Sequence, residues 1–305
     1  MKIAVVGPGA MGSLFAAYLS EGGLEVTLVD HRPERVERLS AEGITVKGSR
    51  GEHHVRIPVV AEASQVGTAE LVIVCVKAYQ TAAALQQHLA LVGEQTTVWS
   101  IQNGLGNVEA MARLLPAARI VGGSTTLGAN KLGVGLLHHA GEGDTLIGEL
   151  DGRVSARVER IAALLTAAGI TVRISQEIRR VIWSKLLVNV GINALTAILG
   201  VSNGTLLEHE PSLQLMDAAV GEAVRVAAEQ GFAFAEHEVQ ARVREVARRT
   251  GQNRSSMLQD VLAGRRTEVE FINGAIARLG AAPVNGTLTR LVLALEAAGP
   301  AGRLR

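Results

Sequence analysis

The chain has 305 residues, of which 48% are hydrophobic and only 3% aromatic, and its 30 Lys and Arg nearly balance 29 Asp and Glu. This length suits two domains, since single cores stop growing at roughly 250 to 300 residues. The scarcity of aromatic side chains favours layered α/β and helical cores over an all-β sandwich. The balanced charge provides no extended positive field for a phosphate backbone, so nucleic-acid binding is not expected.

Cysteine usage and hydropathy predict a soluble protein of a reducing compartment. The single cysteine, Cys75, lies in the apolar run Leu71–Val76, which excludes a disulfide framework. The sequence opens on a strand pattern without an apolar leader and cleavage site, so we expect a cytoplasmic location. Residues 181–201 could span a bilayer, but one lysine and two asparagines interrupt them. We therefore interpret this stretch as a buried helix and expect no membrane partner.

In the first 175 residues, strand and helix patterns alternate. The predicted strands are 2–6, 25–29, 71–76, 96–99 and 170–174, and the predicted helices are 10–19, 33–41, 78–90 and 154–168. This alternation is typical of βαβ units and a parallel, doubly wound sheet. Between Gly122 and Leu150, short β-like pieces broken by glycines indicate antiparallel additions instead of another crossover helix.

From residue 176 onward the pattern is helical, with no convincing strand. The predicted helices are 178–199, 213–230, 236–249, 269–279 and 288–297. The predicted fold class is therefore α/β, with a Rossmann-type dinucleotide-binding domain at 1–175 and an all-helical substrate and catalytic domain at 176–305. No flexible linker separates the two, so we expect them to pack directly and to form the ligand cleft at their junction.

A glycine signature follows the first predicted strand and opens the first predicted helix. Its residues are Gly7, Pro8, Gly9, Ala10, Met11 and Gly12. In this pattern the first glycine permits a tight turn, the second lets the backbone approach a pyrophosphate, and the third lets the helix pack closely. The helix N-terminus supplies N–H donors and a positive dipole to the phosphates. The signature therefore predicts a bound dinucleotide.

The residues that end the second strand bear on which dinucleotide binds. Asp30 could accept the ribose hydroxyls of NAD and would repel a 2′-phosphate, whereas the guanidinium of Arg32 could bind that phosphate. Two other interpretations stay open at this point: Asp30 could cap the following helix, and Arg32 could be a solvated surface charge. The choice between NAD and NADP is open.

A polar stripe runs along the otherwise apolar segment 178–199. Lys185, Asn189 and Asn193 are spaced four residues apart, so they lie on one face of a helix. A ketone that accepts hydride becomes an alkoxide, which a lysine ammonium can stabilise and protonate while the amides orient the substrate. Alternatively, Lys185 could extend to the surface and the amides could cap neighbouring backbone.

With these residues in place, the chain resembles the ketopantoate reductases (2-dehydropantoate 2-reductases) over nearly its whole length. The matching stretches are GPGAMGS at 7–13, VKAYQ at 76–80, QNGLGN at 102–107, WSKLLVNVGINALTA at 183–197, SNGTL at 202–206, NRSSMLQD at 253–260 and RRTEVEFINGA at 265–275. The resemblance implies a Rossmann domain followed by a helical domain like that of 6-phosphogluconate dehydrogenase. It also implies NADPH-dependent reduction of 2-dehydropantoate to pantoate, on the route to pantothenate.

The resemblance also implies roles for individual residues. Lys185 looks like the catalytic proton donor, and Glu268 looks like the acidic residue beside the nicotinamide and the substrate hydroxyl. The implied substrate-binding residues, besides Lys185, are Asn103, Asn189, Asn193, Asn203 and Ser256. The implied cofactor-binding residues, besides the glycine signature, Asp30 and Arg32, are Lys77, Asn103, Gly128 and Glu268. Ser256 could also simply cap a helix beginning at Met257.

The sequence departs from the family pattern at one point, and several alternatives stay open. Asp30-His31-Arg32 stands where many members have a basic residue for the 2′-phosphate, so NADP(H) is implied by resemblance while NAD(H) is not excluded. The substrate could be another 2-keto or 3-hydroxy acid, or the chain could be a non-catalytic NAD(P) sensor. A homodimer is one option for assembly. The adjacent histidine pairs at 53–54 and 138–139 lack metal-ligand spacing, so no metal is expected.

Overall fold

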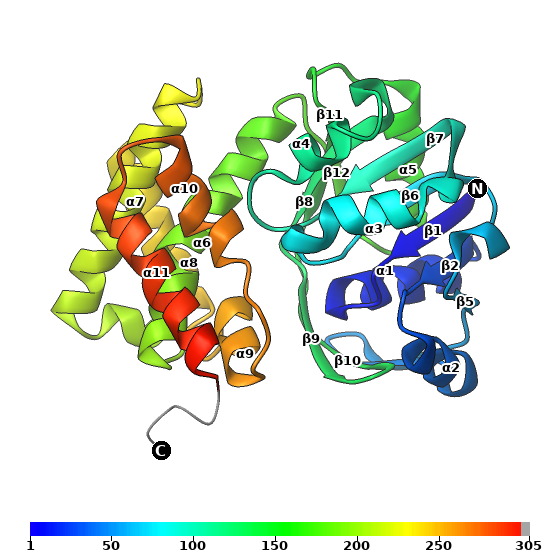
Figure 1. Cartoon of the computed structure of the whole chain (residues 1–305), viewed down its shortest axis with the longest axis horizontal. Coiled ribbons are helices and arrows are strands. Elements are labelled where there is room, and N and C mark those ends of the chain that lie inside the picture. The colour runs from blue at the N-terminus through cyan, green and yellow to red at the C-terminus, as the bar shows by residue number, and fades with distance from the viewer. Residues whose placement is uncertain (300–305) are drawn as a thin grey trace. The chain divides into compact units, whose positions relative to one another are not determined.

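The computed structural model describes residues 1–299 and divides into two compact units (Figure 1). The first unit contains Met1–Gln102 and Asn107–Val181, and the second contains Asn103–Gly106 and the chain from Ile182 onward. The chain thus enters the second unit twice, first with the loop Asn103–Gly106 and again from Ile182.

An eight-stranded sheet forms the centre of the first unit. Its strands are β1 (Lys2–Val6), β2 (Glu25–Val29), β5 (Val59–Val60), β6 (Ala69–Val74), β7 (Val92–Ser100), β8 (Ile120–Thr125), β11 (Thr145–Glu149) and β12 (Val172–Ile174), in the order β12-β11-β8-β7-β6-β1-β2-β5. β1 pairs in parallel with both β2 and β6, whereas β8 and β11 are antiparallel. The predicted doubly wound sheet is confirmed, and its strand order reverses between β1 and β6.

Helices cover both faces of this sheet. They are α1 (Ala10–Glu21), α2 (Pro33–Glu42), α3 (Thr81–Gln87), α4 (Asn107–Ala112) and α5 (Ala156–Ala167), with short turns η1 (Ala63–Gln65), η2 (Ala78–Gln80), η3 (Leu89–Leu91) and η4 (Ala117–Arg119). Ile3 and Val5 of β1 pack in the core that holds α1 and α5, whereas Ala4 and Val6 pack in the core with α3 and α4. Burial on both faces explains why β1 reads as a continuous apolar run.

A second sheet, which the sequence patterns did not predict, holds four strands. They are β3 (Ile44–Gly48), β4 (Gly51–Val55), β9 (Gly128–Gly133) and β10 (Leu136–Gly141), in the order β4-β3-β10-β9. The antiparallel pieces expected between 122 and 150 are confirmed as β8 with β11 and β9 with β10. The pairing of β10 with β3 joins segments about 90 residues apart, and no local periodicity reports such a pairing.

Two predicted elements of the first unit differ in the structure. The single helix expected at 78–90 is instead η2, α3 and η3, because i→i+3 bonds from Gln80 to Lys77 and from Leu91 to His88 tighten both ends. The strand expected at 96–99 extends over 92–100, and α4 was not predicted.

The second unit is all helical over its described residues, as predicted for the chain beyond residue 176. Its helices are α6 (Ile178–Leu199), α7 (Glu210–Glu229), α8 (Glu236–Arg249), α9 (Ser256–Leu262), α10 (Asn273–Leu279) and α11 (Pro283–Ala298), with turns η5 (Gly204–Leu207) and η6 (Val269–Phe271). The predicted helix 269–279 is split, since the backbone of Ile272 (φ −110°, ψ −95°) separates η6 from α10. α11 starts five residues earlier than predicted, with Pro283 at its first turn.

Helix α6 lies at the core of the second unit. It is long and apolar enough to cross a membrane by length and composition, yet 67% of its most apolar window is buried within the protein. A Cβ at Gly191 would lie 2.7 Å from Val243 of α8 and 2.9 Å from Val220 of α7, so these helices approach α6 closely. The prediction of a buried central helix is confirmed.

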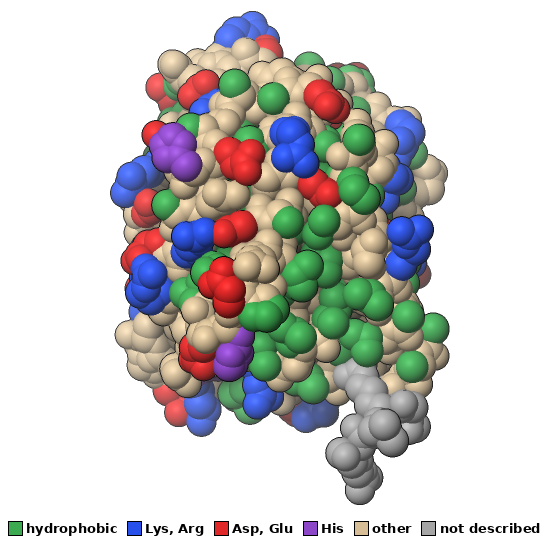
Figure 2. All heavy atoms as spheres, turned by 90° about the vertical axis from the view of Figure 1, so that its left-hand side faces the viewer, with side chains coloured by type: hydrophobic (Ala, Val, Ile, Leu, Met, Phe, Trp, Pro, Cys, Tyr) green, Lys and Arg blue, Asp and Glu red, His purple; other side chains and the backbone are tan. Residues whose placement is uncertain are grey.

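Apolar side chains also gather on one outer face of the helical unit (Figure 2). Leu215 of α7 and Leu291 of α11, two helices in contact, are 45% and 46% exposed. Neither α7 nor α11 carries a residue predicted for the site.

Candidate active site

The turn after β1 contains two glycines at positions where a Cβ atom would not fit. Gly7 has a φ of +97°, and a Cβ there would lie 2.7 Å from Val76, while a Cβ at Gly12 would lie 2.2 Å from the carbonyl oxygen of Gly7. The Gly7 N–H donates to the Val29 carbonyl at 3.0 Å and so joins the turn to β2. Glycine is therefore required at both positions by the protein's own backbone.

The middle glycine of the signature is different, because protein packing does not require it. The atom nearest to a Cβ at Gly9 would be the Cys75 carbonyl oxygen at 4.0 Å. Helix α1 begins at Ala10 without a side-chain cap and without an acidic residue in its first turn. The first N–H groups of a helix have no acceptor within the helix, so open space and donors occur together here. These features fit a dinucleotide pyrophosphate.

Asp30 is buried and already engaged. Its side chain is 1% exposed and forms an ion pair with Arg35 of α2, while the Arg32 N–H donates to Oδ1 at 3.3 Å. His31 Nδ1 lies 3.6 Å from the same oxygen, and Arg32 itself is exposed. Asp30 is not the cap of α2, because the residue before the helix is Arg32 and that terminus has no side-chain cap. The sequence patterns did not indicate the contribution of Arg35.

Two further predicted cofactor residues lie beyond the carboxyl ends of strands in the same sheet. Lys77 follows β6 and directly succeeds Val76, which contacts Gly7. Gly128 begins β9, three residues after β8 ends. Because β1, β6, β7 and β8 run in parallel, both residues and the glycine turn lie beyond the carboxyl ends of these strands. Lys77 and the glycine turn follow β6 and β1, between which the strand order reverses.

In the helical unit, Lys185 and Glu268 come together although 83 residues separate them. Lys185 is only partly exposed on α6, and Glu268, 6% exposed, directly precedes η6. Burial lowers the pKa of Lys185 from 10.5 to about 8, and the negative charge of Glu268 acts in the opposite direction and raises it. A lysine with such a pKa can exchange a proton near neutral pH.

The two asparagines of the α6 stripe are not used to cap backbone. Within residues 1–299, no hydrogen bond joins the Asn189 or Asn193 carboxamide to another residue, and Asn193 is 6% exposed. The alternative in which these amides cap neighbouring backbone is therefore wrong for the described chain. The donors and acceptors of both carboxamides are therefore not used within the described residues.

The other predicted substrate residues of the helical unit, Asn203 and Ser256, differ in how far the protein itself uses their polar atoms. Asn203 donates through Nδ2 to Thr250 Oγ1 at 2.9 Å, while its buried Oδ1 has no partner in the described chain. Ser255, not Ser256, caps α9, since its hydroxyl accepts from the Leu258 N–H at 3.0 Å. Ser256 is exposed as the first residue of the helix. The expectation that Ser256 could cap a helix from Met257 is wrong by one residue.

The loop Asn103–Gly106 packs with the helical unit. The Leu105 N–H donates to the Phe271 carbonyl at 2.9 Å, and its side chain packs against the helical core. Gly104 has a φ of +81°, and a Cβ there would lie 2.5 Å from the same carbonyl oxygen. The loop that begins at Asn103 is thereby attached, through Leu105, to Phe271, which lies three residues after Glu268. In the sequence, the Asn103-Gly104 dipeptide indicated only a turn, and no pattern predicted the contact of this loop with Phe271.

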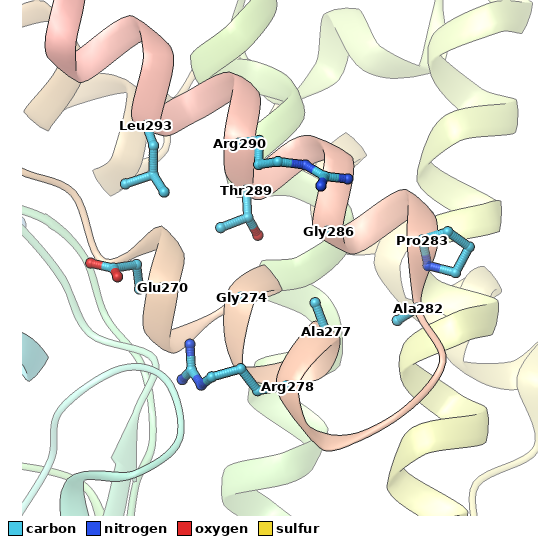
Figure 3. A pocket seen from close by; sticks show the side chains of 10 residues that line it. All are labelled: Glu270, Gly274, Ala277, Arg278, Ala282, Pro283, Gly286, Thr289, Arg290 and Leu293. Carbon is cyan, nitrogen blue, oxygen red and sulfur yellow. The ribbon is translucent and has the colours of Figure 1, made fainter.

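A cavity of about 440 Å³ elsewhere in the helical unit is separate from these residues (Figure 3). It lies between α10 and α11, and its lining includes Glu270, Arg278, Thr289 and Arg290. None of the predicted site residues lines it. Among residues 1–299, no cluster of His, Cys, Asp and Glu is arranged to hold a metal ion.

Comparison with known proteins identifies the family. The sequence model described as ketopantoate reductase PanE/ApbA matches residues 3–152, and the model of its C-terminal part matches residues 177–296. The chain belongs to the ketopantoate reductase family. The 2-dehydropantoate 2-reductase of Halobacterium salinarum is 41% identical over 298 residues, which cover 96% of this chain and 98% of that protein. The enzyme of the same name from Archaeoglobus fulgidus is 39% identical, with 97% and 98% covered.

Solved structures of related proteins share the fold along nearly the whole chain. A ternary structure of D-mandelate dehydrogenase with NADH and anilino(oxo)acetate has a TM-score of 0.92 and 31% identity, covering 98% of this chain and 99% of that one. The 2-dehydropantoate 2-reductase of Geobacter metallireducens has a TM-score of 0.90 and 30% identity, covering 96% and 99%. The ketopantoate reductase fold therefore includes neighbours named for two different substrates.

Proposed function

We propose that this chain reduces the C2 ketone of 2-dehydropantoate to give pantoate, with Lys185 as the proton donor. The observation that carries the proposal is the lysine with a pKa near 8, beside the buried carboxylate of Glu268 and on the same face of α6 as two unpaired carboxamides. The bound nicotinamide would supply the hydride to C2. The protein's own residues would then supply the proton and the orientation.

Lys185 would transfer its proton to the substrate oxygen. As hydride reaches C2, the ketone oxygen gains negative charge, and an adjacent ammonium stabilises this charge and then protonates the alkoxide. Partial desolvation makes the ammonium a stronger acid than an exposed lysine, while Glu268 keeps it protonated near neutral pH. Reduction should therefore slow as the pH rises through about 8.

Polar groups of the helical unit that make no hydrogen bond within it would hold the substrate beside Lys185. The Asn189 and Asn193 carboxamides, the unpartnered Oδ1 of Asn203 and the exposed hydroxyl of Ser256 can bind a carboxylate and a hydroxyl. Asn103 would join them from the loop fixed by Phe271, and it would also contact the cofactor. These groups suit a short, polar 2-keto acid.

The cofactor would lie on the glycine turn, with NADP(H) as the expected form. Asp30 is ion-paired with Arg35, which offsets its repulsion of a 2′-phosphate, and exposed Arg32 and His31 add positive charge beside it. The same pairing weakens Asp30 as an acceptor for the ribose hydroxyls of NAD. An Arg35→Ala variant should lose affinity for NADPH more than for NADH, as measured by fluorescence titration.

A second candidate function has a specific observation in its favour. The structural neighbour with a TM-score of 0.92 is a D-mandelate dehydrogenase that binds NADH. This chain could therefore act on another 2-keto acid with the same proton donor. A 2-keto acid with an aromatic side chain would distinguish this candidate from 2-dehydropantoate.

The decisive experiment follows the absorbance of NADPH and NADH separately with 2-dehydropantoate and with phenylglyoxylate, the keto acid of mandelate. We expect the highest kcat/KM for 2-dehydropantoate with NADPH. A Lys185→Met variant should bind the cofactor normally yet lose at least about 100-fold in kcat, the range typical of a missing general acid. Parental activity of this variant would overturn the assignment of Lys185, and a clear preference for phenylglyoxylate would favour the second candidate.

A further inference from the structure

The short segment that carries Glu268 is fastened at both ends. We call residues 267–273 the Glu268 segment. At one end the Thr267 N–H donates to Glu296 Oε1 of α11 at 2.8 Å, and at the other end stands Asn273, the first residue of α10. Between them, η6 is too short to hold a position by its own hydrogen bonds. Val269 and Ile272 pack in the helical core, and the hydrogen bonds at the two ends add directed contacts to this packing.

Asn273 attaches this segment to the helix of the proposed proton donor. Its side chain is fully buried, and Nδ2 donates to the Val190 carbonyl of α6 at 3.1 Å and to Asn285 Oδ1 of α11 at 2.9 Å. Val190 lies five residues after Lys185 and directly follows Asn189. The Asn273 carboxamide thus joins the Glu268 segment to α6, the helix that carries Lys185.

A second layer of hydrogen bonds holds Asn273 in turn. Asn285 Nδ2 donates to the Ala219 carbonyl and to Glu222 Oε2, both at 2.9 Å. Glu222, itself 4% exposed, also accepts the N–H groups of Val284 and Asn285 at 2.9 Å. The network therefore connects α6, α7, α10 and α11, and its geometry leaves little freedom to the Asn273 side chain.

Packing alone does not explain an amide at this position. Asn273 Oδ1 is buried and has no hydrogen-bond partner in the described chain, an arrangement that costs free energy compared with an apolar side chain of similar size. The two hydrogen bonds that Asn273 Nδ2 donates offset this cost. These bonds fix where the Glu268 segment meets α6, which an apolar contact would not do.

We propose that Asn273 is a positioning residue that sets the distance between Glu268 and Lys185 by tying the Glu268 segment to α6. The proposal rests on the proposed function of Lys185 as the proton donor. It assigns to Asn273 an effect on the reaction without any contact with the substrate or the cofactor. The Phe271 carbonyl, which holds Leu105, belongs to the same segment, so Asn103 would be positioned with it.

The test compares pH profiles of kcat for four proteins. Glu268→Gln removes the charge that favours the Lys185 ammonium, so the alkaline limb should move to lower pH by about one unit. Asn273→Ala should move it in the same direction by about half a unit, because Glu268 is displaced but still charged. The double variant should show no shift beyond that of Glu268→Gln, since Asn273 acts through Glu268.

Ser212→Ala is the matched control for a loss of stability. Ser212 is also buried in the helical unit and donates to the Leu206 and His209 carbonyls at 2.8 Å, away from the Glu268 segment. It should lower the thermal midpoint and leave the pH profile unchanged. If Asn273→Ala is too unstable to assay, Asn273→Ser leaves a smaller cavity and retains one donor, and its profile should shift in the same direction.

The outcomes separate this proposal from the proposed function. An unshifted profile in both Asn273 variants overturns the positioning role, as does an additive shift in the double variant. If wild-type kcat has no alkaline limb near pH 8, or if Lys185→Met keeps that limb, the proposed role of Lys185 fails first.

Discussion

Replacing the partly exposed Lys185 by methionine should remove activity and yet stabilise the folded protein. The pKa of Lys185 is lowered from 10.5 to about 8 in the folded state, so folding works against its protonation. At about 1.4 kcal/mol per unit this corresponds to about 3 kcal/mol, and partial exposure of the side chain reduces it to about 2 kcal/mol. Methionine has a similar shape without the charge, so Lys185→Met should recover most of this free energy at pH 7.

The stability difference between Lys185→Met and the wild type should depend on pH, which gives a more specific test than its size. Below pH 8 both folded and unfolded states bind the proton, so the penalty is fully present. Between pH 8 and 10.5 the unfolded state binds more protons, so wild-type stability rises with pH and the advantage of Lys185→Met disappears. Removing the lysine also leaves Glu268 without its cation, which lowers the absolute gain and does not change this trend.

Urea denaturation of both proteins at intervals from pH 7 to 10.5 measures the difference in unfolding free energy. Lys47→Met, at an exposed position of β3 where the lysine pairs with Glu52 at 3.1 Å, is the control for the loss of a lysine at the surface. A difference for Lys185→Met that stays constant from pH 7 to 10.5 would refute the claim that burial lowers the pKa of Lys185.

Three further predictions concern the glycine turn, the α9 cap and the loop at Phe271. Gly12→Ala places a Cβ 2.2 Å from a backbone oxygen and should abolish NADPH binding in a fluorescence titration. Ser255→Ala should lower the free energy of unfolding by about 1 kcal/mol, because the helix loses its cap. Ser256→Ala should leave the thermal midpoint unchanged and raise KM for the keto acid. The opposite pattern would show that the two serines have the reverse roles. Gly104→Ala cannot keep both its positive φ and its contact with Phe271, so it should raise KM for the keto acid and also lower the thermal midpoint. An unaltered KM would count against the placement of Asn103.

Local periodicity in the amino-acid sequence was enough to predict the features that repeat at short range. The strand-turn-helix around Gly7 and Gly12 was predictable because the tight turn and the close helix admit no side chain there. The stripe of Lys185, Asn189 and Asn193 was predictable because a helix returns to the same face about every four residues. The doubly wound sheet and the all-helical second half followed from the same local periodicities.

The tertiary structure was needed to show which distant residues meet. Asp30 is engaged by Arg35, the acidic partner of Lys185 comes from 83 residues along the chain, and β10 pairs with β3 across about 90 residues. It also decided between neighbours such as Ser255 and Ser256, of which one caps α9 and the other is exposed. Hydropathy patterns report which face of an element is buried, whereas the choice of partner depends on the three-dimensional packing of all the elements together.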